Sequence, residues 1–319
     1  MKTRLAVIWC SATLIAGLIS PCAAADAKKP YEVVHGWPQL PAGYAFGQVT
    51  GIGLDSHHHV FVFHRGEPPV MCFEAATGKL VKSWGAGMIG KAHGLAVDRS
   101  DNVWLTDIGR HQVFKFSHDG DLLMAVGVRD TPGLDGTHLN QPTDVAIAPT
   151  GEIYVSDGYG NSRIAKFSAD GKFISDLGHK GSGPGEFDTP HGIAVDEAGR
   201  VYVADRANAR VQIFDTSGKY ITEWKSADIG RPWDIYVGQD GLFYIMDGGD
   251  MKPAPPDRGR VVLVNRDGQK VDEFGAFGSY DGEFYWGHAL AVSKNGDVYA
   301  TDVHLGMRAQ KFVRTAKGN

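Results

Sequence analysis

Three histidines occupy the same place in three similar segments of the chain, and their side chains could hold a metal ion. The segments read His-Gly-Leu-Ala-Val-Asp from His93, His-Gly-Ile-Ala-Val-Asp from His191 and His-Ala-Leu-Ala-Val from His288. Imidazole nitrogen is a common zinc ligand, and a catalytic zinc keeps three protein ligands and an open position. The sequence therefore predicts a zinc site, although the ligand type alone also suits iron, manganese or cobalt.

The three segments alternate with three others that lack the histidine and begin at Thr50, Thr143 and Trp233. Histidine thus stands in the second, fourth and sixth of six copies. In a ring of six equal units, alternate units are related by about 120°. Three imidazoles at the starts of the innermost strands would then converge on the ring axis. One such histidine is most simply a satisfied polar residue, but strict alternation favours a metal site.

Three further side chains are candidates for anion binding and proton transfer. Arg65 lies in Phe63-His-Arg-Gly66, where the first copy departs from the repeat pattern, and an arginine can hold a carboxylate through two hydrogen bonds. Tyr159 lies between two glycines, and its phenol could transfer a proton if a nearby cation lowered its pKa. Arg206 is a candidate second anion clamp. The alternatives are a surface salt bridge for Arg65, an ordinary loop residue for Tyr159 and a spacer in the repeat for Arg206.

Other polar residues receive a structural interpretation. The aspartate that ends the second strand recurs in five copies, which indicates a repeated hydrogen-bond acceptor at positions 107, 157, 205, 247 and 302. The run from His57 to His59 resembles a metal cluster, but its place between two strand-like segments favours an exposed hairpin turn. Cys72 lies in an apolar strand-like segment, so we expect a core thiol rather than a nucleophile.

The elements that must position these residues are short strands. The copy from His191 to Asp205 contains two apolar runs of alternating character joined by a glycine-containing turn, a pattern typical of strands. Copies begin 42 to 55 residues apart, which predicts propeller blades of four strands. The unit resembles the NHL repeat, whose Asp-x-x-Asn-x-Arg pattern matches Asp205 to Arg210. The predicted fold class is all-β: a six-bladed β-propeller built from NHL-like repeats.

The copies fill residues 45–313, which predicts a single propeller domain over residues 26–319. A strand-like segment, Tyr31 to His35, precedes the first copy. We expect it to supply the outer strand of the last blade, because this closure would remove an exposed sheet edge.

The first 25 residues predict a secretory signal peptide. Lys2 and Arg4 precede an apolar run that ends at Ile19, and small residues follow it. An uncleaved anchor and a lipoprotein attached through Cys22 are the alternatives. We expect an exported protein, periplasmic or extracellular, with no membrane contact after cleavage. Without this segment a single cysteine is left, so an internal disulfide is excluded.

The composition narrows the function classes. Hydrophobic residues make up 43% and charged residues 22% of the 319-residue chain, which excludes a disordered protein. A net charge of −5 without a basic run argues against nucleic-acid binding. The 42 glycines favour many tight turns over a helical bundle.

With these residues identified, the chain resembles the peptidyl-α-hydroxyglycine α-amidating lyases, the lyase half of peptidylglycine α-amidating enzymes. The matching motifs occur in order across four copies. They are Phe63-His-Arg-Gly66, His93-Gly-Leu95, His111-Gln-Val-Phe-Lys115, Gln141-Pro-Thr-Asp-Val-Ala146, Ser156-Asp-Gly-Tyr159, Asn161-Ser-Arg-Ile164 and Pro190-His191.

The resemblance implies a six-bladed propeller with zinc held by the three histidines. It also implies that Arg65 engages the substrate carboxylate and that Tyr159 is the general base or acid. The family's calcium site maps to the main-chain carbonyls of Ile52 and Leu95 and to an aspartate directly after the third histidine. That position is Ala289 here, and the missing carboxylate argues against calcium. Trp286 stands where the family tends to have methionine.

The function expected from these observations is a zinc-dependent lyase. It would cleave the N–Cα bond of an α-hydroxyglycine, either a peptide or a small molecule, into an amide and glyoxylate. One alternative is a non-catalytic NHL propeller that binds a protein or peptide ligand and carries a structural metal. Another is a calcium-dependent lactone hydrolase, which would need inner-rim carboxylates where this sequence offers imidazoles. The sequence leaves the oligomeric state open.

Overall fold

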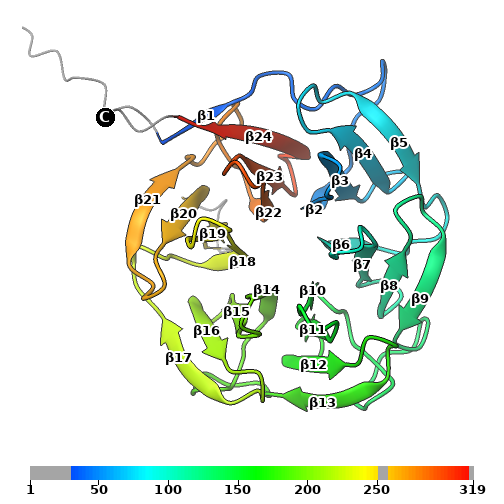
Figure 1. Cartoon of the computed structure of the whole chain (residues 1–319), viewed down its shortest axis with the longest axis vertical. Helices are drawn as coiled ribbons and strands as arrows, with labels where there is room; N and C mark the ends of the chain where they lie inside the picture. Colours follow the sequence, from blue (N-terminus) through cyan, green and yellow to red (C-terminus); the bar gives the residue numbers. More distant parts are fainter. Residues whose placement is uncertain (1–29, 251–257, 316–319) are drawn as a thin grey trace, which may run out of the picture.

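The computed structural model describes residues 30–250 and 258–315, which form six four-stranded antiparallel sheets arranged as blades around a central axis (Figure 1). The predicted all-β six-bladed propeller is confirmed. Within this part of the chain no helix has the length and apolar character that a membrane crossing requires. The predicted signal peptide, including Cys10 and Cys22, lies outside the described residues.

Each blade is named by its place in the chain, and its strands run from the innermost to the outermost. Blade 1 holds β2 (Val49–Leu54), β3 (His59–His64), β4 (Val70–Glu74) and β5 (Leu80–Trp84). Blade 2 holds β6 (Ala92–Val97), β7 (Val103–Asp107), β8 (Gln112–Phe116) and β9 (Leu122–Val126). Blade 3 holds β10 (Asp144–Ile147), β11 (Ile153–Asp157), β12 (Arg163–Phe167) and β13 (Phe173–Leu177). Blade 4 holds β14 (Pro190–Val195), β15 (Val201–Asp205), β16 (Arg210–Phe214) and β17 (Tyr220–Trp224). Blade 5 holds β18 (Pro232–Val237), β19 (Phe243–Asp247), β20 (Arg260–Val264) and β21 (Lys270–Phe274). Blade 6 holds β22 (Gly287–Val292), β23 (Val298–Asp302), β24 (Arg308–Arg314) and, from the N-terminus, β1 (Tyr31–Val33).

An aspartate caps the turn between the first two strands of blades 1, 2 and 4. Asp98 follows β6, and its Oδ1 accepts the backbone N–H groups of Ser100 and Asn102 at 2.9 and 3.0 Å. Asp55 and Asp196 accept two N–H groups of their own turns in the same way. These local bonds satisfy the turn backbone and fix the direction of each hairpin.

A second aspartate, at the end of the second strand, closes the loop of the repeat in blades 2 to 6. Asp205 is fully buried; its Oδ1 accepts the N–H of Asp188 at 2.8 Å. Its Oδ2 accepts bonds from Asn208 and Arg210, both at 2.8 Å. The Asp-x-x-Asn-x-Arg pattern is therefore one hydrogen-bonded unit, and Asp157 repeats it in blade 3. The interpretation of these aspartates as structural acceptors is confirmed.

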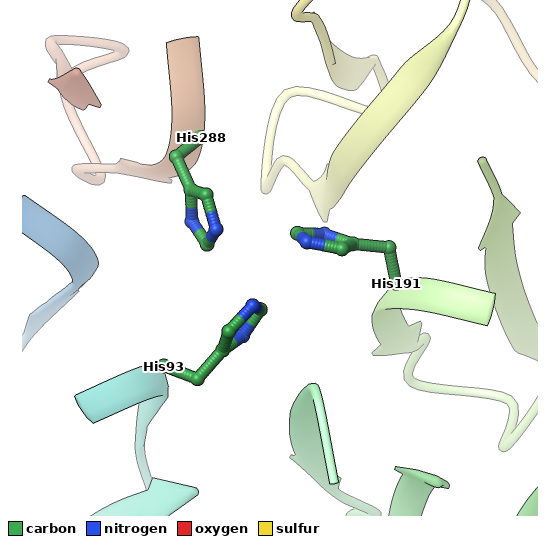
Figure 2. Close-up of side chains that lie close together, drawn as sticks. All are labelled: His93, His191 and His288. Atoms are coloured by element: carbon green, nitrogen blue, oxygen red, sulfur yellow. The ribbon is translucent and has the colours of Figure 1, made fainter. Parts of the chain in front are cut away.

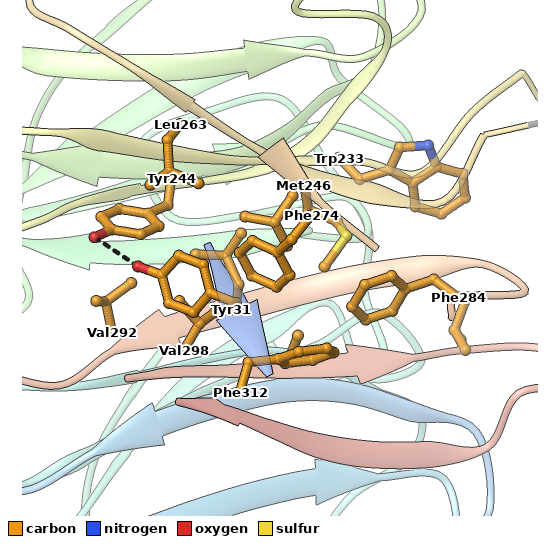
Figure 3. Packing of buried hydrophobic residues seen from close by; sticks show 14 residues of the cluster. Tyr31, Trp233, Tyr244, Met246, Leu263, Phe274, Phe284, Val292, Val298 and Phe312 are labelled. Carbon is orange, nitrogen blue, oxygen red and sulfur yellow. Dashed lines mark hydrogen bonds between the residues drawn. The ribbon is translucent and has the colours of Figure 1, made fainter. Parts of the chain in front are cut away.

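Apolar side chains fill the spaces between neighbouring blades. The cluster between blades 5 and 6 includes Tyr31, Tyr244, Phe274 and Phe312, which meet around the N-terminal strand (Figure 3). Cys72 is buried in another such cluster, and burial raises the pKa of its thiol to about 12. The expectation of a core thiol is confirmed.

Strand β1 closes the ring. It pairs antiparallel with β24, with Tyr31 opposite Arg314 and Val33 opposite Phe312, and so completes blade 6. The expectation that the N-terminal segment supplies the last blade's outer strand is confirmed. Tyr31 anchors this strand. Its ring lies 4.3 Å from that of Phe274, and its hydroxyl lies 3.3 Å from the hydroxyl of Tyr244.

We expect Tyr31→Ala to lower the free energy of unfolding by about 3 kcal/mol, because it leaves a cavity and loosens the strand that closes the ring. Tyr31→Phe should cost about 1 kcal/mol, because only the hydroxyl bond to Tyr244 is lost. Urea denaturation followed by tryptophan fluorescence measures both. Glu32→Ala, on the exposed side of the same strand, is the control; an equal loss in all three variants would contradict an anchoring role for Tyr31.

Candidate active site

The three histidines of the alternating pattern meet on the propeller axis. Each is the second residue of an innermost strand: His93 of β6, His191 of β14 and His288 of β22. Their ring centroids lie 4.7 to 4.9 Å apart, and one nitrogen from each ring lies within 4.8 Å of the other two (Figure 2). The structure therefore brings together the residues that the sequence selected as metal ligands.

Main-chain carbonyls from the intervening blades orient these imidazoles. The Nδ1 of His93 lies 2.6 Å from the carbonyl of Thr143, and the Nδ1 of His191 lies 2.6 Å from that of Trp233. His288 makes the same bond to Thr50 at 2.7 Å. A carbonyl oxygen can only accept, so each Nδ1 carries the proton and each Nε2 keeps a free lone pair. Metal-binding histidines in proteins are commonly held in this way.

The environment keeps all three imidazoles neutral. Burial is the main cause that lowers the pKa of each ring. The positive charge of Arg206 lowers all three pKa values further. That of Arg65 also lowers the pKa values of His93 and His288, and the pKa of His288 falls to about 3. Neutral imidazoles are the form that binds a metal ion, so protons do not compete for these nitrogens at neutral pH.

Tyr159 lies against two of the histidines. Its hydroxyl is 3.0 Å from Nε2 of His93 and 3.2 Å from Nε2 of His191. The tyrosine comes from the loop after β11, which reaches β14 because a Cβ at Gly158 would lie only 1.8 Å from the carbonyl oxygen of Pro190. The absence of a side chain at Gly158 thus allows Tyr159 to pack closely against the histidines.

Arg206 lies next to Tyr159. Its Nη1 donates to the phenol oxygen at 3.3 Å, and its guanidinium stacks 4.5 Å from the ring centre of Trp233. Trp286 lies beyond Trp233, with a ring separation of 6.4 Å, and contacts His304. The cation and the two tryptophans thus form an aromatic wall beside the histidines. No pattern in the sequence pointed to a binding role for Trp233.

Arg65 approaches from the loop between β3 and β4. Its Nε donates to the carbonyl of Ala92 at 3.1 Å, and its Nη1 donates to the side chain of Gln48. Its charge interacts with Tyr159 and with the histidines. Both predicted arginines therefore act on the cluster electrostatically, which makes its surroundings favourable for an anion.

His64 positions the Arg65 loop and was missed in the sequence. Its buried Nδ1 accepts the backbone N–H groups of Gly66 at 3.0 Å and Gly47 at 3.3 Å. Its Nε2 then donates to the hydroxyl of Tyr44 at 3.2 Å. The departure of blade 1 from the repeat pattern was the signal for this residue, because His64 stands directly before Arg65.

A channel of about 290 Å³ along the propeller axis includes the three histidines, Ile52, Leu95 and Ala289 in its wall. Ala289 supplies no carboxylate, but Asp144 and Asp234 hold the corresponding repeat position in blades 3 and 5 and also line the channel. Burial raises the pKa of both carboxyl groups, that of Asp234 to about 7, and the charge of Asp234 raises that of Asp144 further. A comparison of the residue at the position of Ala289 in all six copies would have revealed these two aspartates.

The low pKa of His288 predicts how the metal-free protein responds to acid. The unfolded chain takes up a proton near pH 6.5 and the folded site only near pH 3, so folding stability falls as the pH drops through this interval. Between pH 7 and pH 5 the wild type should lose about 2 kcal/mol more than His288→Gln. Urea denaturation in a chelating buffer measures the difference. Parallel pH curves for the two proteins would contradict the neutral, buried state of this ring.

Comparison with known proteins places this geometry in a family. A family model described as "Domain of unknown function (DUF4934)" matches residues 135–304. The chain is 34% identical over 309 residues to the rat peptidylglycine alpha-amidating monooxygenase, covering 85% of this chain but 31% of that protein. The chain thus spans about a third of the length of this relative.

Two relatives match over more of their own length. The human NHL repeat-containing protein 3 is 33% identical over 235 residues, which cover 68% of this chain and 66% of that protein. The peptidyl-alpha-hydroxyglycine alpha-amidating lyase 2 of Drosophila melanogaster is 31% identical over 333 residues, covering 92% of this chain and 78% of that protein. The chain belongs to the family of the peptidyl-α-hydroxyglycine α-amidating lyases.

Proposed function

We propose that this protein is a zinc-dependent lyase that cleaves the N–Cα bond of an α-hydroxyglycine, releasing an amide and glyoxylate. The observation that carries the proposal is the convergence of three neutral imidazole nitrogens next to the phenol of Tyr159, with two arginines beside them. The family membership supports lyase chemistry, and the peptide or small-molecule nature of the substrate is part of the proposal.

The donor set fits zinc. A catalytic zinc takes three imidazole nitrogens with free lone pairs, and the three Nε2 atoms provide them. The opposite nitrogen of each ring, Nδ1–H, donates to a main-chain carbonyl, as is common for zinc-binding histidines. His93, His191 and His288 would hold the ion. When bound, it would supply Lewis acidity toward the hydroxyl and carboxylate oxygens of the substrate.

The arginines would bind and orient the substrate. A glycine-derived carboxylate is a planar anion, and a guanidinium matches it with two parallel hydrogen bonds. Arg65 is anchored by Ala92 and Gln48, and Arg206 by its stacking on Trp233. We assign the carboxylate to Arg65 and propose that Arg206 holds the phenol of Tyr159 in place, through the 3.3 Å bond to its oxygen.

Tyr159 would move the proton that the reaction transfers. The substrate hydroxyl gives up its proton to the oxygen of Tyr159 in its phenolate form, to which Arg206 donates a hydrogen bond, and becomes the aldehyde oxygen of glyoxylate. The electron pair of the breaking N–Cα bond goes to nitrogen, which receives a proton from the phenol and becomes the amide. One group thus serves as base and then acid, which suits its place beside two histidines.

The calcium ion implied by the resemblance has a different donor set here. Ala289 lacks the carboxylate, whereas Asp144 and Asp234 bring two into the same channel. Backbone N–H groups of Ile193 and Leu290 already bond to them. No step of the proposed reaction depends on this ion.

Export from the cytoplasm stays a prediction from the first 25 residues.

Metal-replete protein should release glyoxylate from α-hydroxyhippurate, and chelation should abolish this release until zinc is restored. Tyr159→Phe should lower kcat by about 100-fold or more, because the ring stays and the transferable proton is lost. A coupled glyoxylate assay measures both, with circular dichroism as the control for folding. Turnover that survives complete metal removal, or full activity in Tyr159→Phe, would contradict the proposal. Absence of turnover in a well-folded, zinc-loaded protein would favour the ligand-binding alternative.

Arg65→Ala should lower kcat/KM for α-hydroxyhippurate by about 100-fold, since a hydrogen bond to a charged group contributes roughly 1.5–3 kcal/mol. The methyl ester of the same substrate should lose far less, because it lacks the carboxylate charge. Arg65→Lys is the matched variant, which keeps the charge and loses the two-pronged geometry. Equal losses on the acid and the ester would contradict a carboxylate-binding role.

A further inference from the structure

A second group of metal-ligating side chains lies at the far end of the innermost strands. Asp55 follows β2 and His59 begins β3 in blade 1, and His118 comes from the turn between β8 and β9 in blade 2. Thr50, whose carbonyl orients His288, lies five residues before Asp55 along β2. At about 3.3 Å per residue, this places the group roughly 16 Å from the histidine centre.

The group is arranged around one buried oxygen. Oδ2 of Asp55 lies 2.9 Å from Nδ1 of His59 and 2.9 Å from Nε2 of His118. Nδ1 of His57, on the same turn, lies 4.0 Å from this oxygen. The carboxylate side chain is fully buried, whereas the side chains of His59 and His118 are 24% and 28% exposed. An ion can therefore reach the group from solvent and meet an anchored carboxylate.

Other blades show that capping the turn does not require imidazoles. In blade 2, Oδ2 of Asp98 accepts from Asn102 and from the indole of Trp104. In blade 4, Oδ2 of Asp196 accepts from the guanidinium of Arg200. Amide, indole and guanidinium N–H groups only donate. In blade 4 this oxygen also accepts the hydroxyl of Tyr202. Blade 1 alone among these three surrounds the same oxygen with imidazole nitrogens, which are good ligands for transition-metal ions.

The two turns are held together before any ion binds. Asp101, in the turn after β6, accepts the backbone N–H and the hydroxyl of Ser56 at 2.8 and 2.7 Å. Asp101 also lies 3.3 Å from Nδ1 of His57. These contacts join the β2–β3 turn to the β6–β7 turn of blade 2. Lys82 of β5 bonds to His118 and Asp119 and holds the β8–β9 turn against blade 1, so an ion bound there would not have to order a free loop.

The outer contacts of His118 provide the remaining part of a metal site. Lys82 donates to Nδ1 of His118 at 2.7 Å, so in this state the proton sits on Nε2 and points at Asp55. Asp119 lies 3.2 Å from the same Nδ1 and 2.6 Å from the Lys82 ammonium. If the proton moves to Nδ1, it can be donated to Asp119 while Lys82 stays bonded to Asp119. Nε2 is then free, in the carboxylate–histidine–metal arrangement common in proteins.

We propose that Asp55, His59 and His118 bind a divalent first-row transition-metal ion of the zinc and copper type, with His57 as the fourth ligand. Two or three imidazole nitrogens and one carboxylate oxygen suit these ions and do not suit calcium or magnesium. The ion would join the first hairpin of blade 1 to the outer hairpin of blade 2. The proposal is independent of the lyase activity, because none of these residues belongs to the histidine centre.

The test is the zinc stoichiometry of chelator-treated full-length protein, measured by equilibrium dialysis against Zn²⁺ with metal analysis. The His59→Asn/His118→Gln variant should bind one equivalent less than the wild type. Asparagine is chosen because Asn102 caps the corresponding turn of blade 2, so folding is preserved. His58→Asn is the matched control: its residue lies exposed on the same turn, at a positive φ that asparagine tolerates. This control should bind as the wild type does.

Two further variants separate this site from other sources of zinc binding. His191→Gln should still bind the one equivalent of zinc that we assign to Asp55, His59 and His118, whether or not the central histidines bind zinc. Asp119→Asn should weaken zinc binding about tenfold, as expected for loss of an outer carboxylate. The proposal is overturned if the His59→Asn/His118→Gln variant keeps the wild-type stoichiometry. It is also overturned if Asp119→Asn leaves the zinc affinity unchanged, because exposed histidines that bind zinc non-specifically would not depend on an outer carboxylate.

Discussion

The hydrogen bond from each histidine Nδ1 to a carbonyl of the next blade is the interaction on which the site depends. It fixes the tautomer and aims Nε2 at the axis. Because histidine occurs in alternate blades, one blade supplies the imidazole and the next supplies the carbonyl. The ring of six blades thus provides three imidazole ligands and three supporting carbonyl groups from a single repeat position.

The same arrangement sets the electrostatics. Burial at the axis keeps the imidazoles neutral, which costs the protein stability in acid but makes the nitrogens available to a metal ion. Positive charge enters through two arginines on loops, each tied to a strand or an aromatic ring. Rigid strands therefore carry the ligands, while the loops carry the groups that would recognise a substrate.

Repetition explains what could be predicted from the sequence. The blade pattern, the ring closure by Tyr31–Val33 and the meeting of the three histidines all follow from one position recurring in six copies. The supporting carbonyls of Thr50, Thr143 and Trp233 could not be read in this way, because any residue type presents a carbonyl. The contact between His59 and His118 was also hidden, since it joins different positions of two blades and needs the hairpin geometry to be known.

Closure by β1 has a consequence for how the chain is made. The strand synthesised first pairs with the strand synthesised last, so blade 6 stays incomplete until β24 has left the ribosome. The third imidazole, on β22, also emerges near the end of translation. A nascent or prematurely terminated chain therefore has two of the three nitrogens and an open ring. The arrangement of three imidazoles that could hold a metal ion at the axis is therefore complete only after the last blade has formed.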